Sequence, residues 1–195
     1  MTLSRRGFLR ATYGATAAAT AVTVGQTVSP LKDVSLLAPR VPDIGPQGLP
    51  VNRSAKDAAI VVPDEYRLVV EGGRTELSLT LDELQALPQH AVDLPIACVE
   101  GWSAMASWTG VRVRDLLDLA GIPHDKRILV DSLEKRGSYR TSILDRGHAR
   151  DPHTLLALRL KGEVLAPDHG YPLRLIAPDR PGVLQTKWVG RLSSL

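Results

Sequence analysis

The sequence is poor in cysteine, because Cys98 is the only one among its 195 residues. A lone thiol cannot form a disulfide within the chain. Iron–sulfur clusters usually take four thiolates, and attachment of a c-type haem needs two cysteines followed by a histidine, so this chain alone can hold neither. Cys98 is therefore either a buried bystander or a group present for its chemistry. If the protein does redox chemistry, the electrons must pass through a partner.

The sequence also lacks an apolar run strong enough for a stable membrane span. The stretch from Ala11 to Val28 is only mildly apolar, rich in alanine and threonine, and it follows the arginine pair Arg5 and Arg6. This order is typical of a twin-arginine export signal. We expect residues 1–28 to be a signal peptide with Ala19-Thr20-Ala21 as a small-x-small cleavage site. An uncleaved membrane anchor and a basic N-terminus that is amphipathic or disordered are the alternatives.

Export by the twin-arginine route predicts a periplasmic, extracellular or cell-envelope location. The route is associated with proteins that fold before they cross the membrane, commonly because cytoplasmic machinery must insert a cofactor. The predicted leader and the lone thiol therefore both favour a cofactor-binding protein.

The chain after the leader has no excess of either charge. Three of the 24 lysines and arginines, namely Arg5, Arg6 and Arg10, lie in the leader, which leaves 21 basic residues against 21 acidic ones. This balance gives no argument for a nucleic-acid partner. The hydrophobic content of 44% is that of an ordinary globular domain with a core.

The pattern beyond the leader predicts one α+β domain and no internal repeat. Residues 29–50 contain five prolines, so they are expected to form an extended arm that precedes a domain over residues 51–195. Short strands, few helices and no βα alternation favour an α+β fold over a doubly wound sheet. The predicted strands cover residues 66–71, 75–79, 91–99, 127–132, 138–143, 172–177 and 183–189; the predicted helices begin at the capping box of Thr80 and Glu83 and cover residues 112–120.

Cys98 lies at the end of one of these predicted strands. Glu100-Gly101 is expected to form a tight turn after it, and Trp102 and Trp108 can wall a pocket. A thiolate is a soft ligand, suited to soft or high-valent metal centres. A cysteine at a strand end is nevertheless more often a small core residue, so the local pattern alone leaves both interpretations open.

Two ordered blocks of residues carry a more specific pattern. The first comprises Ala97–Ser103, Trp108–Val111 and Asp115–Leu117, and the second comprises Leu155–Ala157, Gly162-Glu163, Asp168–Arg174 and Lys187–Arg191. Together they resemble the molybdopterin-binding domain of the sulfite oxidase family. The resemblance covers most of the predicted domain, and it implies a mixed, β-rich, single-domain fold of the sulfite oxidase type. It further implies an enzyme, a molybdopterin-dependent oxidoreductase whose cofactor is molybdenum-molybdopterin.

The same resemblance implies roles for individual residues. Cys98 matches the cysteine whose thiolate binds molybdenum, and Tyr139 resembles a tyrosine near the oxo group, so both are catalytic candidates. His169 and Arg174 match a pair that grips the pterin and its phosphate, and a guanidinium fork suits phosphate. The other cofactor-binding candidates that the resemblance implies are Asn52, Arg53, Lys56, Asp131, Gln185, Thr186 and Lys187.

Departures from the sulfite oxidases bear on the expected substrate. Those enzymes carry a further C-terminal domain and an arginine-asparagine-histidine triplet, whereas this sequence stops soon after Arg191 and has Val51-Asn52-Arg53 at the corresponding place. In domain content the chain is closer to small exported reductases of this fold that act on protein methionine sulfoxide.

We therefore expect two-electron oxygen-atom transfer on a small or protein-bound sulfur or nitrogen oxo compound. The expected electron partner is external, either a haem protein or a quinone-linked membrane protein, and the N-terminus is a candidate for membrane association. The alternatives are a non-catalytic exported binding module of the same fold and a hydrolase that pairs Cys98 with His169.

Overall fold

A computed structural model describes residues 12–16, 45–98 and 102–195 of the chain. The chain divides into two units, Met1–Val41 and Pro42–Leu195. Residues 12–16 are helical, whereas the rest of the predicted leader, residues 29–44 of the predicted arm and the predicted turn at Glu100-Gly101 lie outside the described residues. Within the described ranges, no helix combines the length and the hydrophobicity that crossing a membrane requires.

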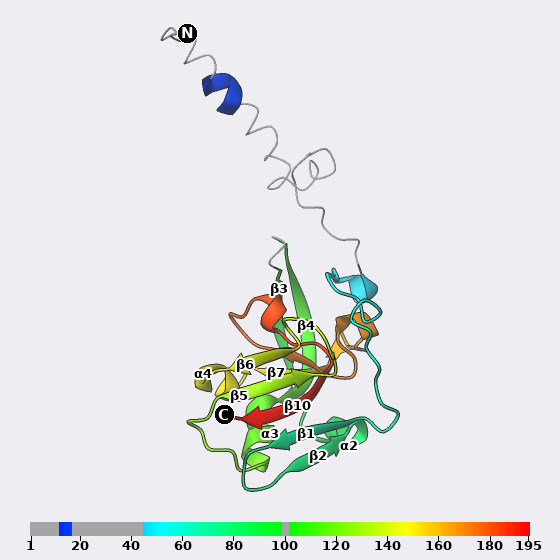
Figure 1. The fold of residues 1–195 in the computed structure, drawn as a ribbon, viewed down its shortest axis with the longest axis vertical. Coiled ribbons are helices and arrows are strands. Elements are labelled where there is room, and N and C mark those ends of the chain that lie inside the picture. Colours follow the sequence, from blue (N-terminus) through cyan, green and yellow to red (C-terminus); the bar gives the residue numbers. More distant parts are fainter. Residues whose placement is uncertain (1–11, 17–44, 99–101) are drawn as a thin grey trace. The chain divides into compact units, whose positions relative to one another are not determined.

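The described part of the second unit is built from two five-stranded sheets (Figure 1). The strand order is β2-β1-β10-β5-β6 in the first sheet and β3-β4-β7-β8 in the second, where β9 also pairs with β7. Strands β1 and β10 run parallel, and the other pairs are antiparallel. The strands are β1 (Arg67–Glu71), β2 (Leu77–Thr80), β3 (His90–Ala97), β4 (Ser103–Arg112), β5 (Ile128–Ser132), β6 (Thr141–Leu144), β7 (Leu155–Leu160), β8 (Glu163–Val164), β9 (Arg174–Ile176) and β10 (Val189–Ser194).

Short helices complete the unit. They are the α-helices α2 (Leu81–Ala86), α3 (Val113–Leu119) and α4 (Arg146–Arg150) and the 3₁₀ turns η2 (Pro46–Gly48), η3 (Pro167–His169) and η4 (Gly182–Leu184). The described residues form many short strands and few helices, which agrees with the predicted α+β class.

Local sequence signals account for the first hairpin and helix. Strands β1 and β2 pair as predicted around Gly72-Gly73, and Thr80 caps helix α2. The Thr80 hydroxyl accepts from the Glu83 backbone N–H at 3.2 Å, while the Glu83 carboxylate accepts from the Thr80 N–H at 2.8 Å. Both bonds of the predicted capping box are therefore present. Helix α3 also forms where predicted, and Gly121 follows it with a left-handed φ of +69°.

The predicted strand over residues 183–189 is wrong. Residues Gly182–Leu184 form η4, an irregular loop follows, and strand β10 begins only at Val189. Trp188 adopts a left-handed conformation with φ of +54°, which a continuous strand does not allow. The strand predicted over residues 138–143 is displaced and is observed at Thr141–Leu144. Strands β4, β7 and β8 and helix α4 were not predicted as elements.

The main hydrophobic core lies between the two sheets and includes helix α3. Val130 of β5 and Leu192 of β10 face inward from the first sheet, opposite Leu156 and Leu175 of the second. Leu116 of α3 packs into the same cluster and is fully buried. Complete burial of such a side chain contributes roughly 1.5–3 kcal/mol relative to exposure.

A second, smaller core supports the end of the unit that carries Cys98. Trp108 is fully buried there with Ile96 and Leu160, and Leu49 joins them from the N-terminal segment. Gln47 ties this segment to the domain, because its amide donates to the Val164 carbonyl at 3.0 Å and its oxygen accepts from the Ala166 N–H at 2.9 Å. The last residues of the predicted arm therefore belong to the folded unit.

Candidate functional site

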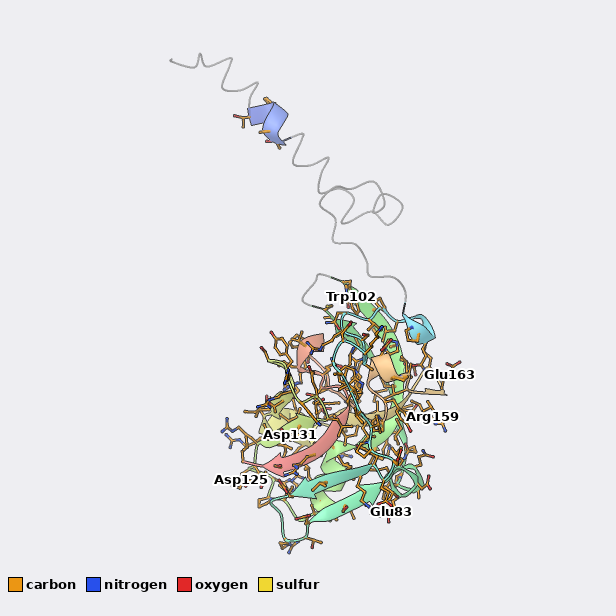
Figure 2. All side chains as sticks on the ribbon, turned by 45° about the vertical axis from the view of Figure 1, so that its right-hand side comes forward. Glu83, Trp102, Asp125, Asp131, Arg159 and Glu163 are labelled. Carbon is orange, nitrogen blue, oxygen red and sulfur yellow. The ribbon has the colours of Figure 1, made fainter. Side chains whose placement is uncertain are left out.

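A pocket brings together residues from five parts of the chain beside Cys98. It is formed by the N-terminal segment, the β3–β4 hairpin, the loop between β5 and β6, the start of β9 and the loop before β10, and it contains about 700 Å³ of empty space including its mouth. Trp102, on the same wall as Cys98, marks this end of the unit (Figure 2). The predicted site residues on its wall are Asn52, Arg53, Cys98, Tyr139, Arg174, Gln185, Thr186 and Lys187.

Cys98 follows directly after strand β3, and the pairing of β3 with β4 fixes its place. The Cys98 N–H donates to the Trp102 carbonyl at 2.8 Å, which continues the ladder beyond the pair of Ala97 and Ser103. Its thiol is on the pocket wall and forms no disulfide, and the Asn52 amide nitrogen lies 3.9 Å from Sγ. Cys98 is therefore accessible from the pocket rather than packed in the aliphatic core.

Arg174 presents a buried cation to the same pocket. Its guanidinium stacks 5.2 Å over the ring of Trp108, and Nη1 donates to the His169 carbonyl at 3.2 Å. Nε is buried and has no hydrogen-bond partner among the described residues. Burial lowers the pKa of Arg174 to about 10, so the group is still charged at neutral pH. A buried cation with an unused donor is expected to bind an anionic ligand.

Lys187 lies next to Arg174 on the pocket wall. Its ammonium donates to the carbonyls of Arg53 and Asp168, each at 2.8 Å. Burial, and then the positive charge of Arg174, lower the pKa of Lys187 to about 7. An anion in the pocket would favour its charged form.

Gly170 allows these two side chains to lie together. A Cβ at Gly170 would be 3.1 Å from the Lys187 Cβ and 3.2 Å from the Arg174 Cβ, and its φ of +110° is unfavourable for other residues.

The loop before β10 is held rigidly in place. The Gln185 amide donates to the Arg180 carbonyl at 3.0 Å, and the Arg180 guanidinium donates to the Ile143 carbonyl of β6 at 3.0 Å. The hydroxyls of Thr186 and Ser142 lie 2.8 Å apart. Gln185 Oε1 is buried on this wall and accepts no hydrogen bond from the described residues. It is available to accept a hydrogen bond from a ligand N–H or O–H.

Three predicted cofactor residues are not on the pocket wall. His169 is buried, and its Nε2 donates to the Pro46 carbonyl at 2.5 Å. Asp131 lines a second depression, on the outer face of the first sheet, together with Arg140 and Arg191 and away from Trp102 (Figure 2); this depression shares Ser132 and Glu134 with the pocket. Lys56 lies on neither wall. The structure therefore does not bring His169, Asp131 or Lys56 to the position that direct contact with a ligand in this pocket requires.

The position of His169 also bears on the hydrolase alternative. Burial is the main reason that its pKa is lowered to about 4, so the ring is neutral and serves as a donor to Pro46. It holds the N-terminal segment and is not on the pocket wall that carries the thiol. A pairing of Cys98 with His169 as nucleophile and base has no support in this arrangement.

The pocket also contains a carboxylate that the sequence did not single out. Glu134, in the loop between β5 and β6, is buried on the wall and forms an ion pair with Arg53. Its backbone N–H donates to the Ser132 hydroxyl, which in turn donates to the Lys187 carbonyl at 2.8 Å. In sequence Glu134 is followed by Lys135 and Arg136 and has the appearance of a solvated charge, so no local signal distinguishes it.

The residues present fit a cofactor that carries its own metal ligands and an anionic group. The described residues contain no cluster of three or more histidine, cysteine or acidic side chains that could hold a metal ion. Cys98 can supply one sulfur ligand, so a metal there must arrive with other ligands. Arg174 and Lys187 supply the positive charge for an anionic end, and Gln185 supplies an acceptor.

Comparison with known protein families decides the assignment. The model of the family described as "Oxidoreductase molybdopterin binding domain" matches residues 55–195. The chain belongs to this family. It is therefore an oxidoreductase domain whose cofactor is molybdenum-molybdopterin, as the resemblance predicted.

Individual relatives of this molybdopterin-binding domain agree. Mitochondrial sulfite oxidase of Drosophila melanogaster is 31% identical over 68% of this chain and 28% of that protein. A protein of Azospira oryzae named "Putative protein-methionine-sulfoxide reductase subunit YedZ1" is 36% identical over 65% of this chain and 48% of its own length. The chain thus spans less than a third of the sulfite oxidase and about half of the Azospira protein.

A solved structure confirms the fold. The sulfane dehydrogenase SoxCD of Paracoccus pantotrophus superposes with a TM-score of 0.60 at 24% identity, over 75% of this chain and 40% of that one. The predicted β-rich, sulfite oxidase-type architecture is therefore confirmed.

Proposed function

We propose that this molybdopterin-binding domain catalyses two-electron oxygen-atom transfer on a small or protein-bound sulfur or nitrogen oxo compound. One observation carries the proposal: the thiol of Cys98 is on the wall of the same pocket as the buried guanidinium of Arg174, whose Nε has no hydrogen-bond partner among the described residues. The names of the relatives, a sulfite oxidase and a methionine-sulfoxide reductase subunit, support a sulfur oxo compound as substrate.

The pocket residues have separable roles in this proposal. The Cys98 thiolate would be the protein's ligand to molybdenum, and Arg174 and Lys187 would hold the anionic end of the cofactor. Tyr139, which is 55% exposed on the pocket wall, would donate its hydroxyl proton to a substrate oxygen. The Asn52 amide, 3.9 Å from Sγ, would orient that sulfur.

When bound, the molybdenum-molybdopterin cofactor supplies the redox change. Reduction of an oxo substrate consumes two electrons and two protons, breaks the bond to the substrate oxygen and releases water; oxidation follows the same balance in reverse. The chain has a single cysteine, so the electrons require an external partner. We infer that this partner is a haem protein or a quinone-linked membrane protein.

We also propose that the protein acts in the periplasm or cell envelope. The support is the arginine pair Arg5 and Arg6 followed by the mildly apolar stretch up to Val28.

The decisive experiment uses the full chain purified after export from cells that make the cofactor. We expect about one molybdenum atom per chain and turnover of at least one compound in a series of sulfite, sulfoxides and N-oxides, followed with an artificial electron dye. The matched variant is Cys98→Ser, which keeps the size and hydrogen bonding of the side chain but removes the soft ligand. It should lose turnover while retaining the wild-type circular dichroism spectrum.

Two results would count against the proposal. Undiminished turnover in Cys98→Ser contradicts the ligand assignment. Wild-type protein without molybdenum and without activity on any compound favours a binding module of the same fold.

A further inference from the structure

The pocket wall carries one buried carboxylate among three cations. Arg53, Arg174 and Lys187 are cationic side chains on the wall, and Glu134 is the acidic one among its described residues. Glu134 is only 8% exposed, although an isolated carboxylate is costly to bury. A buried charge at this place alters what the pocket can bind.

Contacts of the loop between β5 and β6 and of Arg53 fix the position of the Glu134 carboxylate. The Glu134 backbone N–H donates to the Ser132 hydroxyl at 3.1 Å. The loop turns back at Gly137, where a Cβ would lie 2.6 Å from Glu134 Oε1, and the φ of +129° also favours glycine. Arg53, whose side chain is about half exposed, closes over the carboxylate as its ion-pair partner.

Asn52 links this ion pair to the thiol. Arg53 directly follows Asn52, whose amide is 3.9 Å from Cys98 Sγ. The Gly137 Cβ position is also within 3.6 Å of the Arg53 guanidinium, so the loop and the N-terminal segment meet at this point. Glu134 and Arg53 therefore lie on the same wall as Cys98, and Arg53 is next to the residue that contacts the thiol.

The other two cations on the wall are held by contacts within the protein. Lys187 donates to two backbone carbonyls, and Arg174 is stacked on Trp108 and donates to the His169 carbonyl. We have assigned both to the anionic end of the cofactor. Arg53 adjoins Asn52, the residue that contacts Cys98 Sγ, and Glu134 pairs with Arg53 and offsets its charge. Among the other described side chains of the wall, Asn52, Tyr139 and Trp102 are uncharged.

We propose that Glu134 determines the charge of the substrate: by neutralising Arg53 it makes the pocket select uncharged oxo compounds, such as sulfoxides and N-oxides, over oxyanions such as sulfite. The inference rests on the proposed function, and it names the substrate class and the residue that sets it. Without the carboxylate, Arg53 would attract an oxyanion, and the carboxylate itself repels one.

The test measures binding of inorganic sulfate, an unreactive oxyanion, to the purified cofactor-loaded protein by calorimetry at low ionic strength. Glu134→Gln keeps the shape of the side chain and removes its charge, so we expect sulfate to bind about tenfold more tightly than to the wild type. The control is Glu163→Gln, which removes an exposed carboxylate of β8 that is not on the pocket wall and should leave sulfate affinity unchanged (Figure 2).

A second pair of variants measures the effect of the Glu134 charge in a protein that lacks the Arg53 guanidinium. Arg53→Gln alone should bind sulfate about tenfold more weakly than the double variant Arg53→Gln with Glu134→Gln, because only the single variant keeps the carboxylate. This comparison remains available if Glu134→Gln alone does not fold. Equal sulfate affinities within either pair overturn the proposal.

Binding of sulfate does not depend on turnover, so the two proposals can fail separately. If no neutral oxo compound is turned over but Glu134→Gln binds sulfate more tightly, the proposed reaction is wrong and the role of Glu134 in anion exclusion stands. If sulfoxides are turned over and the sulfate affinities are equal, the reaction stands and the role of Glu134 is wrong.

Discussion

At the scale of single residues, the site depends on side chains whose surroundings alter their ordinary chemistry. Arg174 is buried and stacked on Trp108, and its Nε has no hydrogen-bond partner among the described residues, so an anion that accepts from it would be bound favourably. His169 shows the opposite case, because a residue expected to bind the cofactor is neutral, buried and bonded to Pro46. In each case burial, rather than residue type alone, determines what the side chain does.

Replacement of Arg174 by lysine should impair retention of the cofactor while leaving the fold intact. Lysine keeps a positive charge but lacks the planar fork and the Nε–H donor. We expect molybdenum to be lost at least about tenfold faster on dialysis. The matched control is Arg159→Lys, an exposed residue of β7 whose replacement should leave the loss rate at the wild-type value. Equal loss rates in Arg174→Lys and the wild type would contradict the assignment.

Replacement of His169 by glutamine should flatten the dependence of stability on pH. The pKa of His169 in the folded protein is about 4, below the value of about 6.5 expected when unfolded, so between these limits the unfolded chain binds more protons. Stability due to the neutral ring is therefore complete above about pH 6.5, and it falls as the pH is lowered towards 4, by at most about 3 kcal/mol.

The measurement is urea denaturation at several pH values between 4 and 7. The wild type should lose stability across this range more steeply than His169→Gln, even though the variant is less stable at pH 7. Parallel pH profiles for the two proteins would show that His169 does not titrate in this window.

At the scale of elements, local sequence signals correctly predicted the helices and strands whose formation depends on local contacts. The β1–β2 hairpin, α2 and α3 were predicted because a diglycine turn, a capping box and a helical spacing each act within a few residues. Strand β10 was misplaced by several residues, because its limits are set by parallel pairing with β1 and by the left-handed Trp188. Neither is visible in a short stretch of sequence.

The capping box offers a test at this scale. Thr80→Ala removes the hydroxyl that accepts from the Glu83 N–H, and it should destabilise the domain by about 1 kcal/mol. Ser78→Ala, which alters an exposed position of β2 two residues earlier, is the control and should change stability by less than about 0.5 kcal/mol. Chemical denaturation of the three proteins gives the comparison, and equal losses for both variants would argue against a specific capping effect.

At the scale of the whole molecule, the site is formed by segments that are far apart in sequence. The family motifs identified eight pocket residues, including Cys98, Arg174 and Lys187. They did not identify Glu134, because its burial results from Gly137 and Arg53 approaching in three dimensions. The sequence around Glu134 does not show that Gly137 and Arg53 lie beside it, so the charge balance of the pocket could be obtained only from the structure.

The N-terminal segment provides a prediction at the same scale. Leu49 lies outside the residues that match the family, yet it is 1% exposed in the smaller core. Leu49→Ala should destabilise the domain by about 2–4 kcal/mol and accelerate loss of molybdenum, since the segment carries Asn52 and Arg53 onto the pocket wall. Val61→Ala, an exposed control position, should do neither. Thermal unfolding and metal retention are the two measurements, and wild-type values for Leu49→Ala would refute a structural role for this segment.

The position of β10 in its sheet has a consequence for biogenesis. This strand follows the other described strands in chain order, yet it lies between β1 and β5 in the middle of the first sheet. The sheet therefore cannot be completed on the ribosome before residue 194 has been synthesised. Gln185, Thr186 and Lys187 come immediately before this strand, so the pocket can be closed only at the same late stage. Until translation had passed this point, the pocket of the nascent domain would be open to the cofactor. Pairing of β10 with β1 and β5 would then close the pocket around it.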